Sequence, residues 1–182
     1  SQLMWWPSGV GLTNDGHLIV SDREGDRIHV YKLIQFEGPA IPVNAAINDA
    51  WYDPSTPGQG LFLNVYGKVT QSMFVAWFTY DLERPPVSTP FELGDPGHRW
   101  LTAQGIFNTY TATLSIYNTT GSVFLDNSID PTTSPYGQMT IRFQDCSRGT
   151  VTFSLPSVNR SGEFPIRRLT NDSKTFCEQL IQ

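Results

Sequence analysis

The residues of this chain that could do chemistry are acidic side chains placed beside tryptophans. Asp49 and Asp53 flank Trp51, and Asp81 and Glu83 follow a second tryptophan-containing segment. Glycoside hydrolysis uses two carboxyl groups, one to donate a proton and one to act as nucleophile or base. Spacing along a chain does not fix the separation of two carboxyl groups in space, so carboxylates that cap turns are the alternative interpretation.

Aromatic side chains are the second group with chemical potential. The aromatic residues between positions 51 and 100 that we consider for binding include Trp51, Tyr52, Trp77, Phe78, Tyr80 and Trp100. Aromatic rings in a sheet either pack in the core or form a surface on which sugar rings and apolar ligands stack. We assign the binding hypothesis to Trp51, Tyr52, Tyr80 and Trp100. Trp77 is the poorest candidate, because it lies in the most apolar run of the chain.

Other reaction chemistries have no motif in the sequence. There is no Gly-x-Ser-x-Gly elbow and no complete phosphate-binding loop. We interpret the three histidines, His17, His29 and His98, as ordinary strand or surface residues. We therefore assign no catalytic residue, no metal ligand and no cofactor, and leave enzymatic activity open.

The net charge and the composition exclude some classes of binding partner. The formal net charge is −5 and the sequence pI is about 5.0. Nucleic-acid binding needs a concentrated basic face, so no nucleic-acid partner is predicted. No apolar run approaches the length of a membrane-spanning helix, so no membrane span is predicted.

The two cysteines bear on the cellular compartment in which the protein is found. Cys146 ends a predicted strand and Cys177 lies in the C-terminal tail, so a disulfide between them would pin the tail to the sheet. Two buried thiols that act as small apolar side chains are the alternative. A low-charge β-protein rich in Asn, Thr and Gly is typical of exported chains, which favours the disulfide and an extracytoplasmic location.

Short strands separated by glycine-containing turns make up the first 32 residues. The turns Asn14-Asp15-Gly16 and Glu24-Gly25-Asp26 supply the backbone conformations that tight hairpins need. The segment resembles an NHL repeat in Pro7, Gly9, Val10, Gly16, Asp22, Arg27, Ile28, Val30 and Tyr31. The resemblance implies one blade of a β-propeller. One blade does not close a ring, so self-association or attachment to a larger propeller is expected.

The rest of the chain divides into a linker and a β-module. Residues 33–47 contain Gly38-Pro39 and Ile41-Pro42 and are predicted to be an extended linker. Residues 48–182 are predicted to form the module, with strands over 60–66, 73–80, 99–105, 110–117, 122–126, 138–143, 150–155 and 164–169. Their spacing, without helical periods between them, predicts antiparallel meander connections. The predicted fold is therefore all-β, a barrel or sandwich of about eight strands with the N-terminal blade-like segment.

Two details of the module follow from local patterns. The continuous apolar run Phe74–Phe78 predicts a central strand buried on both faces. Residues 173–181 predict a short C-terminal helix, with Phe176 and Leu180 on one side and Ser173 as its cap.

The module resembles a β-domain of exported bacterial proteins that is often appended to repeat-bearing chains. The matching residues are Trp51, Tyr52, Pro54, Gly58, Gly60, Trp77, Thr79, Tyr80, Asp81, Trp100, Gly105, Phe143, Asp145, Cys146, Gly162, Arg168 and Leu169. The resemblance implies an extracytoplasmic module and no particular activity. The leading hypothesis is a non-enzymatic binding or docking module for a carbohydrate, a small apolar ligand or a protein. The alternatives are a carbohydrate hydrolase and a structural appendage of a propeller.

Overall fold

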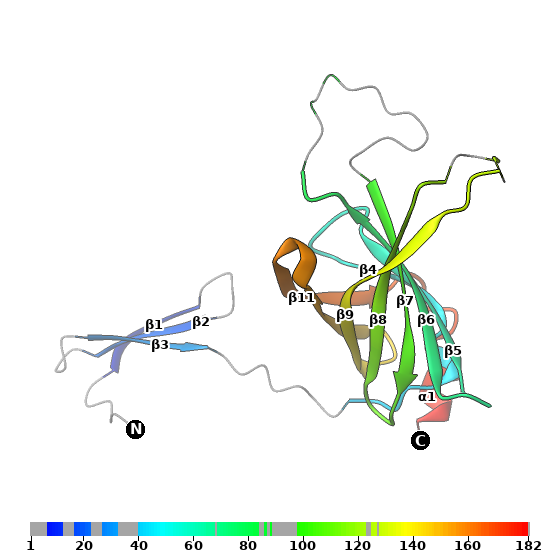
Figure 1. Ribbon diagram of the computed structural model, residues 1–182. Helices are drawn as coiled ribbons and strands as arrows, with labels where there is room; N and C mark the ends of the chain where they lie inside the picture. The colour runs from blue at the N-terminus through cyan, green and yellow to red at the C-terminus, as the bar shows by residue number, and fades with distance from the viewer. Residues whose placement is uncertain are drawn as a thin grey trace. The chain divides into compact units, whose positions relative to one another are not determined.

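The computed structural model describes residues 7–12, 17–22, 27–32, 40–67, 69–83, 86, 88, 98–122, 125–126 and 128–181. The chain forms two units, Ser1–Gly38 and Pro39–Gln182. The second unit carries the larger core and contains strands β4 to β11, most of which are labelled in Figure 1.

The first unit is a three-stranded antiparallel sheet. Its strands are β1 (Pro7–Leu12), β2 (His17–Asp22) and β3 (Arg27–Lys32), in that order. This confirms the predicted β-segment, while the two predicted turns lie outside the described residues. Val20 is buried, whereas Val10, Ile28 and Val30 are exposed.

The second unit is a closed barrel of eight strands, which confirms the predicted all-β fold. The strands are β4 (Asp49–Tyr52), β5 (Gly60–Tyr66), β6 (Ser72–Tyr80), β7 (His98–Phe107), β8 (Ala112–Thr120), β9 (Thr132–Asp145), β10 (Arg148–Leu155) and β11 (Arg160–Arg168). Each pairs antiparallel with the next along the chain, and β11 closes the ring by pairing with β4. The barrel is therefore the predicted meander closed on itself.

Side chains along each strand point alternately into and out of the barrel, and the inward ones fill its interior. In β6, Met73, Val75 and Trp77 are buried and point inward, while Phe74 and Phe78 are exposed. The prediction that this strand is buried on both faces is wrong. A barrel wall is one sheet thick, and no described element covers the outer face of β6.

The prediction of a strand over residues 122–126 is also wrong. Its described residues belong to the connection between β8 and β9, where Gly121 and Leu125 have φ angles of +87° and +56°. Backbone in that left-handed region cannot continue an extended strand. The eighth strand is instead β4, a segment of four residues that the prediction does not include.

One end of the barrel is closed by residues 40–48. Ile41 donates its N–H to the Phe143 carbonyl at 2.9 Å, and Val43 donates to the Thr109 carbonyl at 2.8 Å. The 3₁₀ turn η1 (Ala45–Ile47) follows, and the Asn44 side chain caps it. Ile41, Val43 and Ile47 are part of the core. Residues 40–47, assigned to the linker from sequence, thus belong to the barrel unit.

The C-terminal helix α1 (Lys174–Leu180) is tied to the same end. Cys146 and Cys177 form a disulfide with their Cα atoms 5.8 Å apart, which confirms the predicted pair. Phe176 and Leu180 remain exposed, because the disulfide turns the Cys177 side of the helix toward the barrel. Ser173 makes no side-chain hydrogen bond as a cap, so that prediction is wrong.

A buried arginine joins the segments of the closed end. Arg168 donates from Nε to the Cys146 carbonyl at 2.7 Å and from Nη2 to the Ala46 carbonyl at 3.0 Å. Its Nη1 forms an ion pair with Asp49 Oδ2 at 2.6 Å. The guanidinium also lies over the Trp51 ring, 4.8 Å from its centroid. One side chain therefore links β11, β4, η1 and the β9–β10 turn.

Candidate functional site

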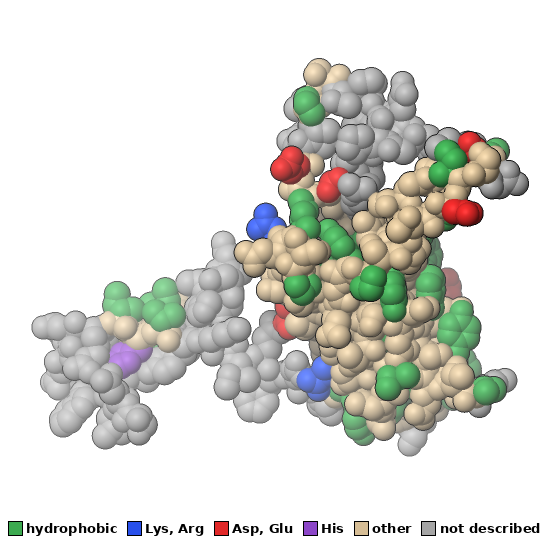
Figure 2. Space-filling model, in the orientation of Figure 1, with side chains coloured by type: hydrophobic (Ala, Val, Ile, Leu, Met, Phe, Trp, Pro, Cys, Tyr) green, Lys and Arg blue, Asp and Glu red, His purple; other side chains and the backbone are tan. Residues whose placement is uncertain are grey.

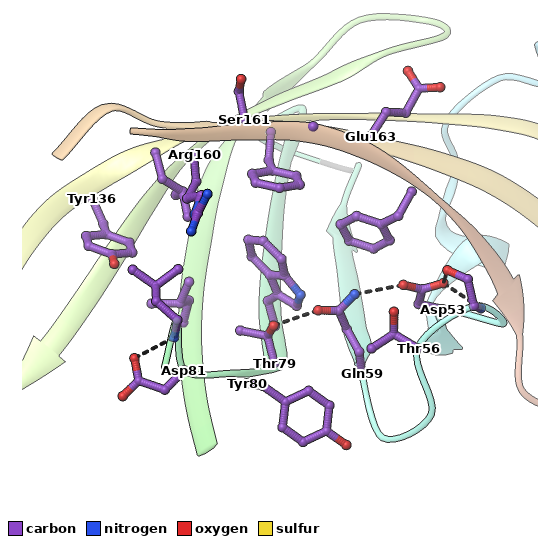
Figure 3. Close-up of a pocket in the computed structure, with 18 of the residues that line it drawn as sticks. Asp53, Thr56, Gln59, Thr79, Tyr80, Asp81, Tyr136, Arg160, Ser161 and Glu163 are labelled. Atoms are coloured by element: carbon purple, nitrogen blue, oxygen red, sulfur yellow. Dashed lines mark hydrogen bonds between the residues drawn. The ribbon is translucent and has the colours of Figure 1, made fainter. Parts of the chain in front are cut away.

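The opposite end of the barrel holds a cavity of about 500 Å³. It is lined by the β4–β5 turn, the end of β6, and the start of β11, and its side chains are drawn in Figure 3. We call it the mouth cavity. Strand alternation places here the inward-pointing residues at the end of the core, including Trp77 and Phe164.

Three aromatic rings form the inner surface of the mouth cavity. Trp77 stacks on Phe164 with ring centroids 5.7 Å apart and an interplanar angle of 26°. Phe153 lies 5.5 Å from Trp77 in a tilted arrangement. Trp77 and Phe164 are buried, and Phe153 packs against the core. The cavity therefore offers a rigid apolar surface at the bottom of an open mouth.

A hydrogen-bonded chain forms one wall of the mouth cavity. The Asp53 carboxylate accepts from the Ser55 backbone N–H at 2.8 Å and from Gln59 Nε2 at 2.8 Å. Thr79 Oγ1 in turn donates to Gln59 Oε1 at 2.6 Å. Figure 3 shows these side chains in a row along the cavity. Each contact holds the next side chain in one orientation.

The charge of Asp53 follows from these contacts. Burial alone would raise the pKa of the carboxyl group, but hydrogen bonds from Ser55, Thr56 and Gln59 outweigh it and hold the pKa below its ordinary value. Asp53 is therefore an ionised hydrogen-bond acceptor at neutral pH. It cannot act as a proton donor there.

The indole N–H of Trp77 makes no hydrogen bond with any described part of the chain, and its Nε1 is fully buried. Trp51 provides the contrast, because its Nε1 donates to the Ile47 carbonyl at 3.0 Å. A buried donor left unpaired costs about 1–3 kcal/mol. Trp77 lines the mouth cavity with its ring, while its buried Nε1 is out of reach of a ligand there.

Two opposite charges lie at the opening. Asp81 and Arg160 both line the mouth cavity, and Figure 3 shows the Arg160 side chain extending into it. Ser161 and Glu163, on the same strand as Arg160, point away from the cavity (Figure 3). Glu163 instead accepts a hydrogen bond from Thr152 on the outer wall at 3.1 Å.

The structure separates the four aromatic residues of the binding hypothesis. Trp51 is 2% exposed and packs on Phe143 at the closed end, 5.1 Å between ring centroids. Tyr80 lines the mouth cavity, where its hydroxyl donates to the Pro57 carbonyl at 2.6 Å.

The other two lie on the outer wall. Tyr52 and Trp100 are in one row of the sheet with Gly60 and Phe78, and they are 37% and 56% exposed. Phe62 meets Phe78 edge to face in the next row. Figure 2 shows hydrophobic side chains scattered among polar ones on the face of the barrel turned to the viewer, with few charges between them.

The four candidate carboxylates are also separated. Asp49 is held by Arg168 at the closed end, and Glu83 is exposed and does not line the mouth cavity. Asp53 and Asp81 do line it.

The sequence interpretation did not find the residues that form the cavity surface. Phe153, Phe164, Gln59 and Thr79 were not named as candidate site residues, and Trp77 was the poorest binding candidate. The available signal was alternation, since Trp77 and Thr79 lie two residues apart and share a face of β6. A residue at the end of an inward-facing row can be buried and still line a cavity.

Comparison with known proteins matches only the first unit. A family model for the NHL repeat matches residues 4–31 and confirms that part of the resemblance. No curated protein and no solved structure matches the chain.

Among the described residues, no helix has the length and hydropathy needed to cross a membrane. The same residues contain no group of three or more His, Cys, Asp or Glu side chains arranged to hold a metal ion.

Proposed function

We propose that the barrel is a non-enzymatic binding module that holds a small ligand in the mouth cavity. The observation that carries this proposal is the lining of the mouth cavity, where the rings of Trp77, Phe153 and Phe164 lie beside the hydrogen-bonded side chains of Asp53, Gln59 and Thr79. A ligand can pack on the rings and exchange hydrogen bonds with the polar wall.

The shape of the barrel supports the proposal. Eight strands leave an interior that side chains can fill or that can hold one small ligand. Here the core fills the closed end, and the mouth cavity, at about 500 Å³, lies within the usual range for small-molecule sites. An aromatic surface with a few fixed polar groups is the usual composition of such sites.

The chemistry of Asp53 favours binding over glycoside hydrolysis. A hydrolase needs one carboxyl group that donates a proton and a second, ionised one whose oxygens are free to act as nucleophile or base. Asp53 stays ionised and so does not fill the first role, and Ser55 and Gln59 already occupy its oxygens, so it is poorly suited to the second. Its evident role is to orient Gln59.

The first unit is better suited to docking than to ligand binding. Val10, Ile28 and Val30 are 72%, 68% and 61% exposed, and a single blade does not bury both of its faces. We infer that neighbouring blades, or a second copy of the chain, cover this sheet. The disulfide supports placing the whole protein outside the cytoplasm, as an exported bacterial chain.

A variant that fills the mouth tests the proposal. Asn118 lines the cavity from β8, so Asn118→Trp should occupy it. Thr113→Trp places the same side chain on the exposed outer face of β8 and is the matched control. In ligand-observed NMR with a library of small ring compounds, we expect compounds that bind the parent and Thr113→Trp and do not bind Asn118→Trp.

Both variants must first unfold cooperatively, as followed by circular dichroism. Binding that persists in folded Asn118→Trp, or a library without any binder, would contradict the proposal.

A further inference from the structure

We propose that the ligand of the mouth cavity is an amphipathic carboxylate, with an apolar ring packed on Phe153 inside the cavity and its carboxylate bound by Arg160 at the opening. This inference rests on the proposed binding function and adds the chemical class of the ligand. It is carried by β11, whose inward side chains run from the aromatic surface to the opening.

The inward face of β11 connects an apolar end of the mouth cavity to a cationic end. Arg160, Gly162 and Phe164 alternate with Ser161 and Glu163, which point away from the cavity (Figure 3). All three inward residues line the cavity. Phe164 is buried and Arg160 is exposed, and the strand between them spans about 13 Å. A ligand that lies along this row meets both ends.

Gly162 leaves room for a ring between these two ends. It pairs with Phe153 of β10, which also lines the cavity and is only partly buried. A Cβ atom at Gly162 would lie 3.3 Å from Cε1 and Cζ of the Phe153 ring. Because glycine has no such atom, this edge of the ring stays uncovered on the β11 side. A planar apolar group can pack there.

The hydrogen-bonded wall keeps its donors engaged within the protein. The Gln59 amide donates to Asp53 at 2.8 Å, and the Thr79 hydroxyl donates to Gln59 at 2.6 Å. The Trp77 N–H is buried out of reach. An acceptor on the ligand gains little from these groups, so the part of the ligand that enters this region is apolar.

Arg160 provides unused donors at the opening. Its guanidinium makes no hydrogen bond or ion pair with any described residue, and the side chain extends into the cavity (Figure 3). A guanidinium has N–H donors and no acceptor, and it binds a carboxylate through parallel, charge-assisted hydrogen bonds. A carboxylate at the outer end of the ligand therefore matches Arg160.

The two acidic side chains nearest to the wall leave this position open. Asp53 follows β4, whose last residue pairs with Arg167, so Asp53 starts about 20 Å along β11 from Arg160. This separation exceeds the Debye length of about 8 Å at physiological ionic strength. Asp81 is engaged in other contacts, among them the Leu82 backbone N–H at 2.8 Å.

Four probes test the inference by ligand-observed NMR and calorimetry. Phenylpropanoate carries both the ring and the carboxylate, and phenylpropanamide replaces the carboxylate by a neutral group of similar shape. Phenylpropylamine carries the opposite charge, and propanoate lacks the ring. We expect phenylpropanoate to bind more tightly than the other three. Added salt should weaken its binding and leave that of phenylpropanamide nearly unchanged.

Two arginine variants test the role of the guanidinium. Arg160→Gln removes the charge at an exposed position, so we expect a folded protein whose Kd for phenylpropanoate is about tenfold higher, the loss of a charge-assisted hydrogen bond. Its Kd for phenylpropanamide should stay within about twofold of the parent value. Arg167→Gln makes the same change on the outer face of β11 and should leave both affinities unchanged.

The outcomes separate the ligand class from the site. If phenylpropanamide or phenylpropylamine binds at least as tightly as phenylpropanoate, and Asn118→Trp abolishes that binding, the ligand class is wrong and the site stands. An unchanged Kd for phenylpropanoate in Arg160→Gln would also overturn the inference, as would a parent protein that binds none of the four probes. If Asn118→Trp abolishes the binding of no compound, both proposals fail.

Discussion

Arg168→Ala is expected to lower the free energy of unfolding by about 3–5 kcal/mol, the usual cost of removing one partner of a buried ion pair. The guanidinium side chain is fully buried, and Asp49 is mostly so. Without it, the Asp49 carboxylate loses its counterion, and the carbonyls of Ala46 and Cys146 lose a donor. Urea unfolding under non-reducing conditions measures the change.

The neighbouring residue provides a matched control. Arg167 is exposed on the outer face of the same strand, so Arg167→Ala should change stability by less than about 0.5 kcal/mol. Arg168→Lys keeps the charge but cannot reach three acceptors with the geometry of a guanidinium, and it should lie closer to Arg168→Ala than to the parent. Equal effects of the Arg167 and Arg168 replacements would contradict the role given to Arg168.

Removal of the disulfide is the second large effect. The Cys146→Ala/Cys177→Ala double variant should lose about 3–4 kcal/mol, because the bond closes a loop in the unfolded chain between cysteines 31 residues apart. Helix α1 is particularly dependent on the bond, since Cys177 is its one buried residue. Ligand binding should be retained where the variant remains folded, because the mouth lies at the other end of the barrel.

The native state of the cysteines is checked by mass. Alkylation under denaturing, non-reducing conditions should leave the intact mass of the freshly purified protein unchanged. Alkylation after reduction should modify both thiols. Two modified thiols before reduction would contradict the disulfide.

Most of the barrel could be predicted because its strands obey simple rules. Residues 60–66 alternate buried and exposed side chains after a turn, and β5 has those bounds. β4 was missed because four residues between Asn48 and Asp53 are too few for a pattern to emerge. The prediction of a strand over residues 122–126 failed because the composition of this segment does not reveal the positive φ angles at Gly121 and Leu125.

The site was less accessible to sequence reasoning. Trp51 seemed suited to binding because acidic residues flank it, but one of them, Asp49, is paired with Arg168, which lies 119 residues further along the chain. Trp77 was correctly placed among buried residues, at 4% exposure. Its role depends on Phe153 and Phe164, which only closure of the barrel brings to it.

The central claim is that a ligand binds at Trp77, and the indole N–H signals of the protein test it most directly. The chain has 5 tryptophans, and their N–H cross-peaks in a ¹⁵N–¹H spectrum can be assigned with Trp→Phe variants. On saturation with the tightest ring compound that binds the parent protein, the Trp77 peak should move, while those of Trp51 and Trp100 stay in place. A shift confined to Trp100, or a spectrum in which Trp77 does not move despite binding, would contradict the account.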